Sequence, residues 1–195
     1  MILCLNDHIQ DMKGDALYRA LAFLPLWRRE RALAYRHEQG QVESALAYLE
    51  LSRALALSGY GDIKPEFEYN EHGKPFLPLY PELHFSISHC QRAVGCLLAQ
   101  VPCGLDIERI RNISPALVKR TMNASEEKQI YSASSPEIEF ARLWTRKEAV
   151  FKLLGTGITD DMADILPKAR LLNIQCETIT NPIHGYVFST ALQTD

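Results

Sequence analysis

The sequence predicts an α+β fold, and three observations carry the prediction. Residues 41–57 have apolar side chains at helical spacing, and Gly59 and Gly61 end that pattern. Residues 64–100 form short apolar runs separated by turn residues, which is typical of antiparallel strands. The same order of helix, glycines and strands returns after Gly104, without a repeat of individual residues. This order hints at a duplicated architecture.

The individual elements follow from the same patterns. In the first half we expect a second helix at 25–35, strands at 67–69, 83–87 and 93–99, and a turn at 70–75. Residues 105–110 alternate apolar and charged side chains, as a half-buried strand does. Beyond them we expect helical segments at 114–131 and 137–154 and strands at 170–174 and 186–192.

Length and composition exclude several classes of protein. The 195 residues leave the domain count open between one domain and two of roughly 100 residues each. A formal net charge of -3 argues against a protein that coats nucleic acid. No apolar run approaches the roughly 20 residues that span a bilayer, and the N-terminus lacks the features of a secretory signal. We therefore expect no nucleic-acid or membrane partner.

The five cysteines are an odd number, and none are spaced as C-x-x-C. This disfavours both a disulfide framework and a zinc ribbon. We interpret them as reduced thiols in the cytoplasm.

Two acidic residues lie two apart in the strand expected at 105–110. Asp106 and Glu108 point to the same face, so their oxygens can hold a hard cation such as Mg²⁺. The alternative is the solvated face of an amphipathic strand.

The helix expected at 137–154 adds a third carboxylate. Trp144, Glu148 and Lys152 are spaced by four, which places them along one edge of the helix. Glu148 can complete the oxygen ligands of a cation, and Lys152 can neutralise a phosphate beside it. The alternative is an exposed ion pair between Glu148 and Lys152, with Trp144 and Phe151 in the core.

Further candidates stand elsewhere. Lys74 lies in the turn G-K-P, and Ser88 and His89 end the strand that begins at residue 83. Arg28, Arg31 and Arg36 belong to the densest positive stretch, which can meet phosphates or form a solvated helix face. The glycine-rich loops of common nucleotide sites are absent from the sequence.

The order G-K-P, F-S-I-S-H, G-L-D-I-E and W-T-R-K-E-A-V-F-K resembles the 4′-phosphopantetheinyl transferases of the surfactin-synthetase-activating type. The resemblance extends from about residue 28 to residue 157. It implies two similar α+β subdomains related by a pseudo-twofold axis, residues 1–103 and 104–195, each with a small antiparallel sheet on a long helix. It also implies transfer of the phosphopantetheine arm of coenzyme A to a serine of an apo carrier protein, with Mg²⁺, by a cytoplasmic monomer.

The resemblance assigns roles residue by residue. It implies Mg²⁺ ligands at Asp106, Glu108 and Glu148, and catalytic roles for Glu148, Lys152 and His89. It implies coenzyme A contacts at Arg28, Arg31, Lys74, Ser88, His89 and Lys152. Two further residues match the family, Glu126 as an acidic residue near the site and Trp144 as an aromatic under the helix.

The chain departs from the family at two positions. Ser86 stands where the family usually has asparagine, and Glu43 stands where a basic residue is common near the start of the first long helix. Glu43 puts part of the contact with the adenine-end phosphate in doubt. Two other functions remain open, a magnesium-dependent phosphohydrolase and a binding module for coenzyme A or a carrier protein that has no catalysis.

Overall fold

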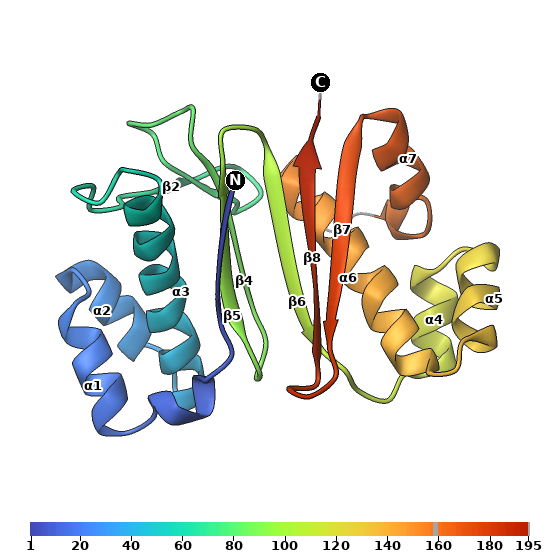
Figure 1. Ribbon diagram of the computed structural model, residues 1–195, viewed down its shortest axis with the longest axis horizontal. Helices are drawn as coiled ribbons and strands as arrows, with labels where there is room; N and C mark the ends of the chain where they lie inside the picture. The colour runs from blue at the N-terminus through green and yellow to red at the C-terminus, as the bar shows by residue number, and fades with distance from the viewer. Residues whose placement is uncertain (158–159, 195) are drawn as a thin grey trace.

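The computed structural model describes residues 1–157 and 160–194. Two units, each a three-stranded sheet with a long helix packed on it, lie side by side in Figure 1. The α+β fold predicted from the sequence is confirmed. No helix among the described residues has the length and apolar character needed to cross a bilayer.

The first unit joins strands from the two ends of its segment. Its sheet has the order β1 (Ile2–Asn6), β5 (Val94–Ala99), β4 (His84–His89), with antiparallel pairing throughout. The 20-residue α3 (Glu38–Leu57) packs on this sheet, and its buried side chains include Leu46, Leu51 and Leu55. The smaller elements are η1 (Ile9–Met12), α1 (Asp15–Ala22), α2 (Leu26–Leu33), β2 (Glu68–Tyr69) and β3 (Pro75–Phe76).

The second unit repeats this arrangement. Its antiparallel sheet has the order β6 (Cys103–Arg109), β8 (Tyr186–Gln193), β7 (Ile174–Asn181), and α6 (Pro136–Leu154) packs on all three strands. The remaining elements are α4 (Pro115–Thr121), α5 (Ala124–Ser132), η2 (Asp160–Ala163) and α7 (Ile165–Leu171). In each three-stranded sheet one strand precedes the long helix in the chain and two follow it, and the last of these lies in the middle of the sheet. In the first unit β2 and β3 form a separate two-stranded sheet.

An apolar cluster joins the two units. Leu97 of β5, Leu105 and Ile107 of β6 and Tyr186 of β8 are each at most 2% exposed and pack in one cluster. Strand β4 lies next to β6, although the two belong to different sheets. Part of the interface between the units is therefore a hydrophobic core.

The structure differs from the predicted elements in several places. The helical segment at 114–131 is two helices, because the Asn123 side chain accepts a hydrogen bond from the Glu126 N–H and starts a new helix. The strand expected at 170–174 is wrong: α7 extends to Leu171, and β7 begins only at Ile174. Strand β1 and helix α1 were not predicted, and α3 begins three residues earlier than residue 41.

Candidate active site

The candidate site lies where β6 packs directly on α6. Gly104 permits this approach, because a Cβ atom there would overlap the carbonyl oxygen of Ala149. The strand then carries Asp106 to the helix edge that holds Lys152. Although 46 residues separate these two in sequence, Lys152 Nζ lies 2.7 Å from Asp106 Oδ1.

Asp106 is the most enclosed of the three carboxylates. Its Oδ1 accepts hydrogen bonds from Lys152 Nζ at 2.7 Å and from the Ser88 hydroxyl at 3.0 Å. Its Oδ2 is buried and has no hydrogen-bond partner among the described residues. The residue is only 5% exposed, so the alternative of a solvated strand face is wrong at this position.

The pKa values of the other two carboxylates lie above their ordinary values. Burial and, second, the charge of Asp106 raise the pKa of Glu148 to about 7. Burial and Asp106 also raise the pKa of Glu108, although Arg111, Lys152 and a hydrogen bond with Trp144 oppose that rise. The charge of Asp106 thus acts on both of the other acids.

The aromatic residues of α6 support this face of the helix. Trp144 is half-buried and stacks on Phe140, with ring centroids 5.8 Å apart, and Phe151 is buried in the core of the second unit. The packing part of the alternative interpretation is therefore correct. Its ionic part differs, because the Lys152 ammonium makes its close ion pair with Asp106 across the strand.

A pocket of about 310 Å³ opens beside these groups. Residues of both units line it: His72, Gly73, Lys74, Pro75, Phe85, Ser86 and Ile87 from the first, and Glu148, Phe151, Lys152, Gly155 and Gly157 from the second. The pocket thus combines the turn G-K-P, strand β4 and the end of α6.

Lys74 lines this pocket, but its ammonium is already occupied. Its Nζ donates to the carbonyl oxygens of Leu153 at 2.8 Å and Cys103 at 3.3 Å, and burial lowers its pKa. The neighbouring Asn70 donates from Nδ2 to the carbonyl oxygen of Gly155 at 3.0 Å. The turn of the first unit therefore caps the C-terminus of α6 in the second, where a cation favours the helix dipole.

His89 lies at the end of β4 and is paired with the unusual acid of α3. Its Nδ1 lies 3.2 Å from Glu43 Oε2, and Gln39 Nε2 donates to Glu43 Oε1 at 2.9 Å. Burial raises the pKa of Glu43, but the hydrogen bonds from His89 and Gln39 outweigh it and hold the pKa below its ordinary value. Glu43 is thus an ionised partner of His89.

The arginines of α2 differ in environment. Arg28 is 8% exposed and donates to the carbonyl oxygen of Ser44 at 2.8 Å, while its Nε has no partner among the described residues. Burial and the charge of Arg31 lower the pKa of Arg28. Arg31 lies over the ring of Tyr69, and Arg36 is exposed. The solvated-face alternative therefore fails for Arg28.

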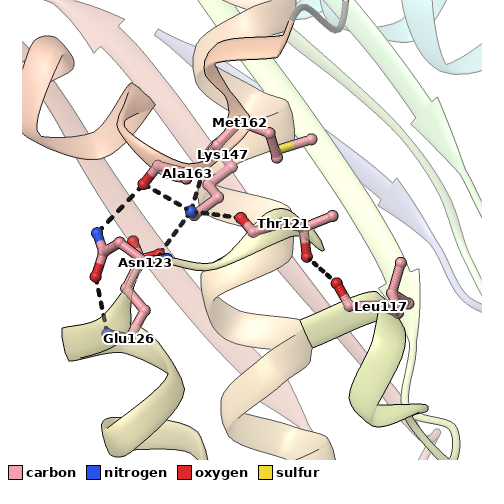
Figure 2. A network of polar contacts seen from close by, with 7 residues as sticks. All are labelled: Leu117, Thr121, Asn123, Glu126, Lys147, Met162 and Ala163. Carbon is pink, nitrogen blue, oxygen red and sulfur yellow. Dashed lines mark hydrogen bonds and ion pairs between the residues drawn. The ribbon is translucent and has the colours of Figure 1, made fainter. Parts of the chain in front are cut away.

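Lys147, immediately before Glu148, was not predicted to have a role. Its ammonium is fully buried and contacts Glu126 Oε2 at 2.6 Å and the carbonyl oxygens of Thr121, Met162 and Ala163 (Figure 2). Glu126 is thus bound to Lys147 within the second unit. For Glu126 the sequence does contain a signal, because the Asn-x-x-Glu spacing from 123 to 126 predicts a capping box.

Comparison with known proteins agrees with this geometry. Residues 102–191, which include β6 and α6, match the model of the 4′-phosphopantetheinyl transferase superfamily. In this segment the chain is similar to members of that superfamily. The superfamily match covers the strand and the helix that carry all three carboxylates.

Curated relatives in the superfamily align beyond that region. A 4′-phosphopantetheinyl transferase of Bacillus subtilis is 29% identical over 147 residues, and 4′-phosphopantetheinyl transferase Sfp of Bacillus subtilis strain 168 is 30% identical over 145 residues. Each alignment covers 72% of this chain and 64% of the relative. HetI of Nostoc sp. is 34% identical over 165 residues, 79% of this chain and 64% of the relative. The chain thus spans less than two thirds of the length of these relatives.

The donor chemistry fits a hard cation. Among the described residues, no three acidic, histidine or cysteine side chains are arranged as a ready-made metal site. The carboxylates of Asp106, Glu108 and Glu148 are nevertheless the ligand type that Mg²⁺ prefers, and Asp106 keeps one buried oxygen without a partner. Lys152 supplies the positive charge beside Asp106 in this structure.

Proposed function

We propose that this chain transfers the 4′-phosphopantetheine arm of coenzyme A to a serine hydroxyl of an apo acyl or peptidyl carrier protein, with release of 3′,5′-ADP. The observation that carries the proposal is the meeting of Asp106, Glu148 and Lys152 beside a pocket formed by both units, inside the segment that matches the superfamily. A cluster of carboxylates with a lysine beside it suits the transfer of a phosphoryl group between two oxygens.

Three carboxylates are proposed to hold Mg²⁺, namely Asp106, Glu108 and Glu148. When bound, the cation neutralises pyrophosphate charge and orients the phosphates. Lys152 is proposed to stabilise the charge of the leaving phosphate, together with His89. Glu148 or a water molecule at the site is proposed to accept the proton of the carrier serine.

The proposed coenzyme A contacts lie along the boundary of the two units. Lys74 and His89 are proposed to bind its phosphates, and Arg28 and Arg31 its adenine end. Arg28 supports this part, because a buried guanidinium with an unused Nε and no acidic partner in the described chain favours an incoming anion. To bind a phosphate, the Lys74 ammonium would have to give up a hydrogen bond such as the one to the carbonyl oxygen of Leu153.

The test is to incubate the protein with coenzyme A, Mg²⁺ and a panel of apo carrier proteins and to weigh the carriers by mass spectrometry. We expect a gain of one phosphopantetheine arm and stoichiometric 3′,5′-ADP. Free phosphopantetheine or phosphate without a heavier carrier would instead identify a phosphohydrolase. Binding of coenzyme A or the carrier without turnover would identify a binding module.

Two variants and one control sharpen the test. Glu148→Gln and Asp106→Ala each reduce transfer at least about a hundredfold while the protein stays folded. Glu127→Gln, a change of the same type on α5, leaves transfer unchanged. If Glu148→Gln modified the carrier at the parental rate, the assignment of Glu148 would be wrong.

We further propose that residues 1–103 and 104–195 are two subdomains related by a pseudo-twofold axis. The support is the shared strand order, in which β1, β5 and β4 correspond to β6, β8 and β7. A superposition of the two sheets and long helices that failed to align these strands would contradict it. We also propose that the protein is cytoplasmic, which its five free cysteines support, and that it is a monomer. Light scattering that gave twice the mass of one chain would contradict the monomer.

A further inference from the structure

The edge of β6 that faces the first unit is closed by side chains. Its other edge pairs with β8, while β4 lies beside it in a different sheet. On this edge the Leu105 N–H donates to Ser86 Oγ at 2.9 Å, and the Ile107 N–H donates to Ser88 Oγ at 3.1 Å. Two serines of β4 thus accept the hydrogen bonds that a neighbouring backbone would otherwise accept.

Both hydroxyls are built into the interior. Ser86 is 5% exposed and Ser88 is 4% exposed, and water has little access to either pair. A buried N–H that loses its acceptor is costly, so these two serines are the means by which the β6 edge is satisfied. Because serines at 86 and 88 are two apart, they match the two-residue spacing of the amides at 105 and 107.

The hydroxyl of Ser88 has no capacity left. It accepts from the Ile107 N–H and from Lys152 Nζ at 2.9 Å, and it donates its single hydrogen to Asp106 Oδ1 at 3.0 Å. A hydroxyl has one donor and two acceptor sites, so all three are used. Ser88 cannot donate to a phosphate and hold Asp106 at the same time.

We propose that Ser86 and Ser88 are positioning residues that replace a backbone ladder between the two units and thereby fix Asp106 and Lys152. This rests on the proposed function of the site, and it extends it. Ser86, one of the departures from the family pattern, then aligns β6 through Leu105, and Ser88 orients the Asp106 carboxylate. With Oδ1 held by Ser88 and Lys152, Oδ2 is left as the buried oxygen that is free for a ligand.

The first experiment is residue-resolved amide hydrogen exchange by NMR on the whole chain without coenzyme A or metal. Ser86→Ala should accelerate exchange of the Leu105 amide about tenfold or more and leave the Ile107 amide within about twofold. Ser88→Ala should accelerate exchange of the Ile107 amide about tenfold or more and leave the Leu105 amide within about twofold. Ser52→Ala should change neither, because among the described residues the Ser52 hydroxyl bonds only to the Tyr48 carbonyl in its own helix.

The second experiment separates positioning from phosphate contact. In carrier-loading assays Ser88→Ala should lower kcat about tenfold or more and raise the Mg²⁺ concentration for half-maximal rate, with the KM for coenzyme A within about twofold. A raised KM at unchanged kcat would overturn the positioning role. Unchanged exchange of the Leu105 and Ile107 amides in the serine variants would also overturn it. That result can be measured even if the parent protein has no transferase activity.

Discussion

Replacing Lys147 by methionine is the strongest test of how α6 is held in place. The ammonium of Lys147 is fully buried and binds one carboxylate and three backbone carbonyls (Figure 2). The carbonyls come from the end of α4 and from η2, and the carboxylate of Glu126 comes from α5. This one side chain therefore ties three segments to α6. Methionine keeps the unbranched apolar stem and removes only the charge and its hydrogen bonds.

The expected cost follows from what is left behind. In Lys147→Met the Glu126 carboxylate stays buried, with one remaining hydrogen bond from the Asn123 N–H at 2.9 Å. Breaking a buried ion pair from one side costs about 3 to 5 kcal/mol. Since the stem volume is nearly kept, the cavity contribution is small. We therefore expect the free energy of unfolding to fall by about 3 to 4 kcal/mol.

The assay is urea unfolding followed by circular dichroism, read as a double-mutant cycle. Glu126→Gln keeps an acceptor for Asn123 and leaves Lys147 with its three carbonyls, so it should cost only about 1 to 2 kcal/mol. The double variant leaves no charge buried alone, and its loss should be smaller than the sum of the single losses by about 1 to 2 kcal/mol. A loss below about 1 kcal/mol for Lys147→Met would refute the reasoning.

Three further predictions concern the site and the core. In metal-free buffer, the raised pKa of Glu148 means that the folded protein binds a proton more tightly than the unfolded chain, so stability falls as pH rises from about 4.5 to 7. Allowing for its half-exposed position, about 1 to 2 kcal/mol is lost, and thermal melts of Glu148→Gln should lack this slope. Gly104→Ala, which overlaps the Ala149 carbonyl, should lower the melting temperature and transfer together, whereas Gly61→Ala meets only ordinary contacts and should change neither. Glu50→Gln should raise stability by about 1 kcal/mol at pH 8 and less at pH 4.5, because burial raises the Glu50 pKa although Arg53, 3.6 Å from its Oε2, opposes that rise; equal melting temperatures at pH 8 would contradict this.

Local signals predicted the fold where the chain itself decides an element's end. Gly59 and Gly155, with φ of 86° and 70°, stand where α3 and α6 were expected to end. Strand β1 was missed because it is stabilised by β5, more than ninety residues away in the register of Ile2 with Leu98. Residues 170–174 carry apolar side chains compatible with either structure, and packing of α7 on the second core decided the helix.

The candidate site was predictable in its members and not in its connections. A two-residue spacing placed Asp106 and Glu108 together, and a four-residue spacing placed Glu148 with Lys152. Nothing in those spacings indicates that Lys152 pairs with Asp106, that Lys74 caps α6, or that hydroxyls close the edge of β6. Such contacts depend on the distance between two separately folded elements, which the sequence pattern of either element does not contain.

The position of α6 explains how mutually repelling carboxylates are held close to one another. Near Glu148 the helix is tied to the second unit through Lys147, and at its C-terminus it is tied to the first unit through Lys74 and Asn70. Between these anchors Glu148 faces Asp106 because both backbones are fixed by packing, with Gly104 setting how close they come. The repulsion therefore appears as a raised pKa rather than as a separation of the elements. A cation that relieves it gains affinity from a site whose backbone needs little rearrangement.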